Sequence, residues 1–278
     1  MWTTTSASVL PSDTKFLPIL HAEKQLLVCR ATPTSLSQDG MHLSDGSVLP
    51  VSAVVYATGW NTADSHFSQS EALDLGLPVP LSAEPLSTAK HWEQLESVAD
   101  QEVCSLFPRL SSPPPHFTKT PTHSPHRLHR NIISPNLLSR GDRSITFVGL
   151  TSNAQTASCS ELTALWAVAW MEDLMPPSFS TSKEDLEMDV ARVNTWMWRR
   201  YLNSRALVEP NVAIEIQTFF DTLMRDLGLR VHRRQKGIFG ILREYLTPYR
   251  ASDYHGVIQE LLERVRKERM EGVKGKDL

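Results

Sequence analysis

The chain has 278 residues, which is enough for one large domain or two small ones. Its 41% hydrophobic and 21% charged residues are typical of an ordinary globular protein, and its formal net charge of -3 gives no general attraction for nucleic acid. The three cysteines are odd in number and widely spaced, which excludes a disulfide scaffold and a zinc-ligand pair. We therefore expect no metal site and no nucleic-acid partner.

The expected cellular location follows from the same features. Cysteine usage fits a reducing compartment. Residues 1–11 lack the basic region and apolar run of a secretory signal. The longest strongly apolar stretch, residues 162–171, has about half of the roughly 20 residues that a membrane-spanning helix needs. The sequence thus predicts a cytoplasmic location and no transmembrane segment.

The amino-terminal part alternates short apolar runs with turn signals. We expect strands at residues 26–30, 41–43 and 48–49, separated by turns at 38–40 and at Asp45-Gly46. The next run, residues 53–57, is continuously apolar and favours a strand covered on both faces, as in a parallel sheet. It ends at Thr58-Gly59, where the missing Cβ of glycine lets a ligand approach or simply forms a turn.

The rest of the chain is dominated by helical patterns. We expect an amphipathic helix over residues 87–106, a proline-rich loop over 111–125, and a second buried strand over 144–150. A polar turn at 151–157 then leads into a buried helix that is capped by Ser158 or Ser160 and ends near residue 174. Helices over residues 183–203, 211–226, 240–246 and 252–271 follow.

Two segments carry a resemblance to a known family. The stretch 44–60 resembles the part of flavin-containing monooxygenases that leaves the nicotinamide-nucleotide domain and returns to the flavin domain. It matches in the Asp-Gly turn, the apolar strand, the Ala-Thr-Gly run and Trp60, whereas Ser52 stands where the family often has an acidic residue. The second segment, 128–135, is similar to the family's leucine, aromatic, basic and proline pattern. It is followed in order by the strand 144–150 and by Ser160-Glu161-Leu162.

The resemblance covers roughly residues 15–175 and implies an α/β fold, namely a partial FAD/NAD(P)-binding, Rossmann-like fold with a helical carboxy-terminal extension. It implies a remnant of the NADP-binding domain with its return strand in residues 1–60. Residues 61–178 would be the carboxy-terminal part of the FAD-binding domain, and 179–278 the helical extension.

The implied cofactors are FAD and NADPH. Eight residues are expected to contact FAD, the last four at the ring: Ala57, Thr58, Gly59, Trp60, Thr151, Asn153, Gln155 and Thr156. No catalytic acid or base is assigned, because the flavin carries the chemistry and the protein positions it and excludes water. Glu161 is expected to complement the helix dipole in the first turn rather than to act as a base.

The family's two Gly-x-Gly-x-x-Gly loops, which hold the pyrophosphates of FAD and NADPH, do not occur in this sequence. Three explanations remain open: a truncated chain, which we favour, a separate amino-terminal half as partner, or a protein repurposed without catalysis. The resemblance implies an FAD-dependent NADPH monooxygenase that oxygenates a small organic molecule, in a setting such as fungal secondary metabolism. The alternatives are a non-catalytic interaction protein and a flavin-dependent reductase.

Two clusters have simpler interpretations. His123, His126 and His129 lie near prolines that disfavour a helix, so we interpret them as a solvated loop. The basic run at residues 230–236 is interpreted as a charged turn between helices rather than a nucleic-acid site. Trp166 and Trp170, four residues apart, are expected to pack in the core.

Overall fold

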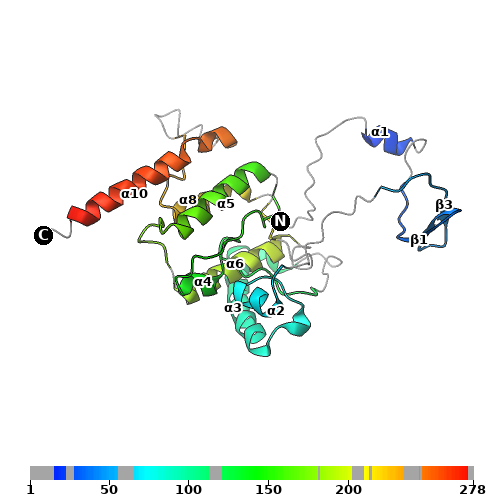
Figure 1. Cartoon of the computed structure of the whole chain (residues 1–278), viewed down its shortest axis with the longest axis horizontal. Coiled ribbons are helices and arrows are strands. Elements are labelled where there is room, and N and C mark those ends of the chain that lie inside the picture. Colours follow the sequence, from blue (N-terminus) through cyan, green and yellow to red (C-terminus); the bar gives the residue numbers. More distant parts are fainter. Residues whose placement is uncertain are drawn as a thin grey trace. The chain divides into compact units, whose positions relative to one another are not determined.

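The structure is a computed structural model. It describes residues 16–22, 28–55, 66–112, 121–153, 155–180, 182–201, 210–212, 215–234, 244 and 246–274. The chain divides into two units, Val9–Asp64 and a larger one that contains Ser65–Leu278. Figure 1 labels their elements along the chain.

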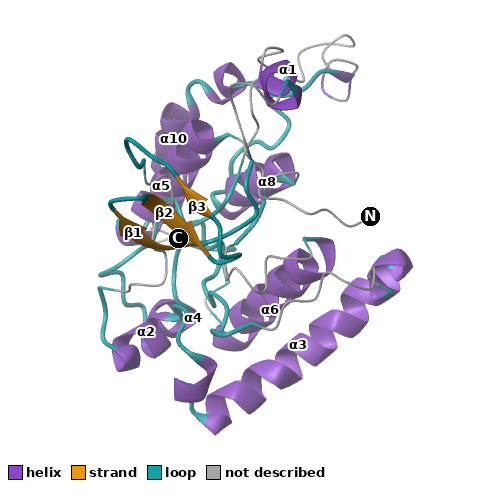
Figure 2. Ribbon diagram, turned by 90° about the vertical axis from the view of Figure 1, so that its right-hand side faces the viewer, coloured by secondary structure: helices purple, strands orange, loops and turns teal. Residues whose placement is uncertain are grey.

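The unit Val9–Asp64 contains a short helix and a small sheet. Helix α1 is Phe16–His21, and strands β1 (Pro33–Ser37), β2 (Gly40–Leu43) and β3 (Val48–Leu49) form an antiparallel meander in that order. Figure 2 shows the three strands as adjacent arrows. The predicted turns and the last two predicted strands are confirmed, with Met41 opposite Leu49 and His42 opposite Val48. Gly46 adopts φ +85 in the second turn, a conformation that glycine tolerates.

The first predicted strand is misplaced. Residues 28–30 form no strand, and the segment that pairs with β2 is 33–37. The physical reason is the tight turn at Gln38-Asp39, which places Ser37 opposite Gly40 and so pairs β2 with the residues immediately before that turn.

The two predicted buried strands are also wrong in their described parts. Residues 53–55 form no strand, and Val55 is 88% exposed. Residues 144–150 likewise form no strand, and Val148 is 44% exposed. An apolar run becomes a strand only where a neighbouring strand completes its hydrogen-bond ladder. In the described part of residues 144–150, the Phe147 amide binds the Ile132 carbonyl at 2.8 Å, but no ladder follows.

The described secondary structure is therefore mixed helix and strand, with an antiparallel sheet. A parallel sheet does not occur among the described elements. Of the described helices, none is long and apolar enough to cross a membrane.

The unit that contains Ser65–Leu278 is helical. Its α-helices are α2 (Gln69–Leu75), α3 (Leu86–Leu106), α4 (Pro135–Ser139), α5 (Thr156–Met171), α6 (Lys183–Arg200), α8 (Ile216–Asp226) and α10 (Val257–Lys274). Short 3₁₀ turns are η1 (Leu81–Ala83), η2 (Pro108–Ser111) and η3 (Ala251–Tyr254). Figures 1 and 2 show α3 beside α6, and α5 beside α8.

Two buried clusters hold these helices together. The larger one joins α5, α8 and the segment before α4, and its centre contains Trp166, Trp170 and Phe220, each at most 2% exposed. This confirms the core position predicted for the two tryptophans. The smaller cluster packs Trp92 and Ala99 of α3 against Val190 and Ala191 of α6.

The helix termini show what the sequence did and did not reveal. Helix α2 was not predicted, although Ser68 and Glu71 form a reciprocal capping box that could have revealed it. Helix α6 begins after Ser182, whose side chain accepts from the Asp185 amide. Gly228, with φ +64, follows the carboxy-terminal end of α8, where glycine commonly ends a helix. Helix α5 begins at Thr156, earlier than the predicted caps Ser158 and Ser160.

Candidate functional site

The candidate cofactor loop, residues 151–155, is held in one conformation by hydrogen bonds of its own side chains. Thr151 is buried, and its hydroxyl lies 3.4 Å from the Cys159 thiol on α5. Burial is the main reason why the pKa of this thiol is raised. Asn153 spans the turn, since its Nδ2 donates to the Thr151 carbonyl at 2.9 Å and its Oδ1 accepts from the Gln155 amide at 2.9 Å.

A second anchor is made by the backbone. The Ser152 amide donates to the Pro210 carbonyl at 2.7 Å, and its carbonyl accepts from the Val212 amide at 3.0 Å. The loop is thus fixed on both sides, to α5 and to the segment that precedes α8. Such anchoring preorganises the polar groups that the loop presents.

The loop leads directly into the amino-terminal end of α5. Gln155 is the N-cap residue, its side chain makes no capping hydrogen bond, and the first turn contains no acidic residue. Gln155 and Thr156 are exposed. An uncapped first turn presents free N–H groups and the positive end of the helix dipole, which suits a polar or anionic ring edge. The residues here therefore fit the electron-rich edge of a flavin ring.

The role expected for Glu161 is wrong. Because α5 begins at Thr156, Glu161 lies beyond the first turn and does not complement the dipole there. Its exposed side chain instead lines a cavity of about 650 Å³ between α5 and the start of α10. That cavity is described further below.

The other four expected contacts, Ala57, Thr58, Gly59 and Trp60, lie outside the described residues. Thr151, Asn153, Gln155 and Thr156 lie together in one loop and helix start, as their sequence positions require. Among the described residues there is no group of three or more His, Cys, Asp or Glu that could hold a metal ion.

The interpretation of His129 as a solvated residue is wrong. Its side chain is 4% exposed and packs against the rings of Trp166 and Phe179, and Nδ1 lies 3.2 Å from the Asp189 carboxylate. Burial lowers the pKa of this imidazole, and the nearby Asp189 only partly opposes that effect. Its partners are 37 to 60 positions away in sequence, so no local signal could have revealed its burial.

Next to it, Arg130 binds Asp189 on α6 and Asp226 on α8, and Trp166 on α5 donates to the same Asp226 carboxylate at 3.1 Å. Arg130 and Asn131 both have left-handed backbones, with φ +55 and +58. Such conformations cost non-glycine residues roughly 1–2 kcal/mol each. The two ion pairs hold them in place and join α6 and α8 to the segment before α4, and the Trp166 hydrogen bond adds α5.

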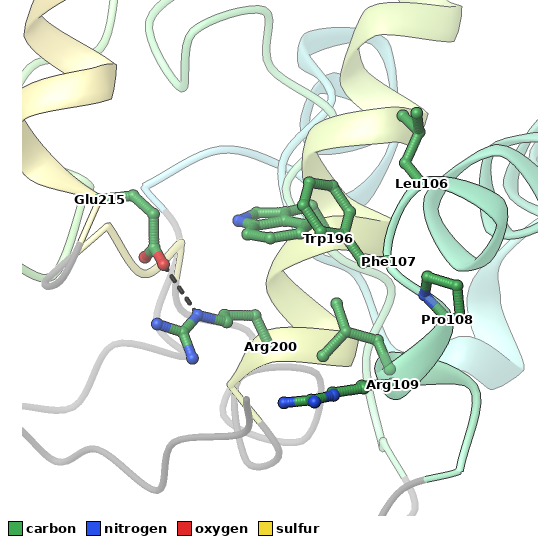
Figure 3. Close-up of a pocket in the computed structure, with 8 residues that line it drawn as sticks. Leu106, Phe107, Pro108, Arg109, Trp196, Arg200 and Glu215 are labelled. Atoms are coloured by element: carbon green, nitrogen blue, oxygen red, sulfur yellow. Dashed lines mark hydrogen bonds and ion pairs between the residues drawn. The ribbon is translucent and has the colours of Figure 1, made fainter.

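A separate cavity of about 490 Å³ lies where α3 and η2 meet the end of α6. Figure 3 shows Phe107 and Trp196 with neighbouring rings, whose centroids are 4.6 Å apart. Arg200 binds Glu215 at 2.8 Å beside them. Of the expected cofactor contacts that the structure describes, Thr151, Asn153, Gln155 and Thr156, none lines this cavity.

In the basic run, the described residues 230–234 form neither helix nor strand, and their arginines are paired with carboxylates. Arg230 and Arg233 bind Glu260 at 3.2 and 3.1 Å, and Arg234 binds Asp253. These carboxylates neutralise the arginines, which leaves little excess positive charge for a polyanion.

Comparison with known proteins shows that the chain as a whole is similar to one group of enzymes. The chain is 31% identical to the FAD-dependent monooxygenase DEP4 of Alternaria brassicicola, over 80% of this chain and 37% of that protein. It is 32% identical to the FAD-dependent monooxygenase resA of Aspergillus sclerotiorum, over 87% of this chain and 41% of that protein. It is also 30% identical to the FAD-dependent monooxygenase rstn6 of Aspergillus nomiae, over 87% of this chain and 41% of that protein.

No protein-family model and no solved structure matches the chain. It spans about two-fifths of the length of the curated relatives that it matches. With about 30% identity to several of them over four-fifths or more of its own residues, the chain is homologous to part of the fungal FAD-dependent monooxygenases.

Proposed function

We propose that this chain forms the ring-side part of an FAD-dependent monooxygenase that inserts oxygen into a small organic molecule. The observation that carries the proposal is the anchored loop at residues 151–155 followed by the uncapped amino-terminal end of α5. Bound FAD, reduced by NADPH, would supply the oxygen activation. The setting that we propose is fungal secondary metabolism.

Each protein group has a defined task in this proposal. The first-turn N–H groups of α5 orient and polarise the ring edge, and the amide side chain of Gln155 adds a donor and an acceptor beside it. Asn153 keeps the loop in the binding conformation through its two internal hydrogen bonds. Thr151 and Thr156 border the ring, and Ala57, Thr58, Gly59 and Trp60 are proposed as further contacts.

The nucleotide ends of the cofactors need other anchors, because the sequence contains no Gly-x-Gly-x-x-Gly loop. We propose that these anchors, and the remainder of a Rossmann-like fold, correspond to the three-fifths of the relatives' length that this chain does not cover. Residues 1–60 would then complete the NADP-binding domain, 61–178 the FAD-binding domain, and 179–278 a helical extension. The missing part would be joined covalently or act as a separate polypeptide partner.

The test is a comparison of flavins. If the chain contacts only the ring, then riboflavin, FMN and FAD bind with dissociation constants within about threefold of one another, since the phosphate and adenylate portions gain no contacts. Quenching of flavin fluorescence and a retained absorbance band after desalting measure this. A chain that binds FAD far more tightly than riboflavin has a nucleotide anchor of its own and contradicts the ring-side assignment. A folded chain that binds none of the three contradicts the proposed function.

A non-catalytic interaction role is the second candidate. Its support is the exposed apolar side chains along α10, where Ile258, Leu262 and Met270 are 59%, 44% and 62% exposed. Flavin binding discriminates the two, because an adaptor needs no flavin. A flavin-dependent reductase would bind the flavin and oxidise NADPH but leave the organic molecule unchanged.

A further inference from the structure

The cavity beside α5 changes in character along its length. Ser158 and Glu161 line it near the amino-terminal end of the helix, and Leu162, Leu165 and Val168 line it farther along. The opposite wall is made by the first residues of α10 and by Tyr254 of η3. It is thus polar near the candidate cofactor loop and apolar away from it.

The polar end of this cavity lies close to the cofactor loop along α5. Residues at i, i+3 and i+7 share one face of a helix, so Ser158 and Leu162 follow Gln155 on the same side of α5. Ser158 lies only two residues beyond Thr156, a rise of about 3 Å along the axis. The polar end of the cavity therefore opens toward the groups that we assign to the flavin ring.

The size and lining fit a small organic ligand. The volume of about 650 Å³ lies within the range of roughly 300–1,000 Å³ typical of such sites. The space beside Gly256 is open, because a Cβ built on this glycine would meet no atom within 4 Å. Val168 is 52% exposed and Ile258 is 59% exposed at the cavity, so apolar surface is available to a ligand.

The Glu161 carboxylate determines which polar group a ligand can place at this end of the cavity. Glu161 is exposed, and the described residues offer it neither an ion pair nor a hydrogen bond. An ionised carboxylate only accepts hydrogen bonds. It would repel an organic acid and favour a hydroxyl or amine donor.

We propose that this cavity is the substrate site: it takes a mostly apolar organic molecule that carries a hydrogen-bond donor at one end. The apolar body lies against Leu165 and Val168, and the donor meets Glu161 near the ring. This inference rests on the proposed function, because the flavin-side loop gives the cavity its reactive end.

The test uses two matched probes on the full chain without flavin: 2-naphthol, which has a donor, and 2-methoxynaphthalene, which has none. Methyl NMR spectra report where each binds, through the signals of Leu162, Leu165, Val168, Val257 and Ile258. Both probes should shift these signals, and 2-naphthol should bind more tightly. Glu161→Ala should weaken 2-naphthol about fivefold and leave 2-methoxynaphthalene unchanged.

A matched pair of valines tests the apolar end. Val168→Asp should weaken both probes by about tenfold or more, because a charge replaces apolar surface. Val98→Asp should not, since Val98 is similarly exposed (46%) in the middle of another long helix, α3, and does not line the cavity. Because both sites are exposed, the chain should tolerate both substitutions.

The outcomes separate this inference from the proposed function. If riboflavin binds but neither probe shifts the cavity methyl groups, the substrate site is wrong and the flavin assignment stands. If the probes bind as expected but no flavin does, the cavity is real and the proposed function fails. A dimer that Val168→Asp dissociates, without any probe binding, would make this face a protein interface and overturn the inference.

Discussion

Arg130 binds Asp226 through two parallel hydrogen bonds, from Nε to Oδ2 at 2.7 Å and from Nη2 to Oδ1 at 3.1 Å. Both side chains are largely buried, at 14% and 11% exposure. The pairing is sequence-distant, since 96 positions separate the two residues. It connects the left-handed segment before α4 to the last turn of α8, and so supports the core on which the candidate loop is built.

The Arg130 network predicts a large effect on stability. Arg130→Met leaves the carboxylates of Asp189 and Asp226 without their arginine partner. It should therefore lower the free energy of unfolding by about 3–5 kcal/mol. Arg130→Lys should cost less, because it keeps the charge but loses the bidentate geometry. Urea unfolding followed by circular dichroism measures both.

The matched control for that series is Arg140→Met. Arg140 also pairs with an aspartate, Asp74 at 2.9 Å, but its side chain is 56% exposed. Exposed pairs contribute little, so this variant should unfold at nearly the wild-type urea concentration. Equal losses in Arg130→Met and Arg140→Met would show that burial of the network is unimportant.

The buried His129 predicts a pH dependence. Burial lowers the pKa of its imidazole from 6.5, so the unfolded chain binds a proton at pH values where the folded chain does not. Stability from this residue is therefore fully present above about pH 6.5 and is lost as pH falls from there toward the lowered pKa. Denaturant midpoints between pH 7.5 and 5.5 measure the loss.

The variant His129→Phe keeps a ring against those of Trp166 and Phe179, but this ring cannot take up a proton. It should show a smaller decrease in stability over the same pH range. An identical decrease in both proteins would place the titrating group elsewhere. Asp189 acts in a separate range: burial alone would raise the pKa of its carboxyl, but His129 and Arg130 outweigh it and hold that pKa below 3.8.

The long helices and the hairpin strands β2 and β3 could be predicted from local signals, whereas the fate of the two continuous apolar runs could not. Helices α3, α5, α6, α8 and α10 have periodic apolar faces or terminal signals within their own sequence. Residues 53–55 and 144–150 have strand-like composition, yet form no strand, because a ladder depends on a neighbour that composition cannot reveal.

The same distinction applies to the candidate site. The loop at residues 151–155 follows from a local motif, whereas the cavity wall supplied by Tyr254 and Val257 lies about a hundred residues further along the chain. The network around His129 likewise joins α5, α6 and α8 through contacts that only the fold creates. Sequence patterns thus indicated the proposed cofactor loop and gave no sign of the proposed substrate cavity.

The loop itself offers a direct prediction. Asn153→Ala removes both hydrogen bonds that close the turn, so riboflavin affinity should fall by about tenfold. Ser152→Ala is the control, because Ser152 holds the loop through its backbone. Fluorescence quenching of riboflavin measures both variants. If the two variants bind alike, the conformation of the turn does not govern flavin binding.

Alanine substitutions at two glycines can distinguish the cost of a left-handed backbone from the cost of a steric clash. Gly76 and Gly141 both have left-handed backbones, with φ +72 and +68. A Cβ on Gly76 would lie 2.6 Å from the Arg127 carbonyl oxygen, whereas one on Gly141 would meet nothing within 4 Å. Gly141→Ala should therefore cost only the strain, about 1 kcal/mol. Gly76→Ala should cost about 3 kcal/mol, since the Arg127 backbone, whose amide also binds the Gly76 carbonyl at 2.7 Å, must move. Urea midpoints of the two variants measure the difference, and equal midpoints would show that the segment before α4 adapts without cost.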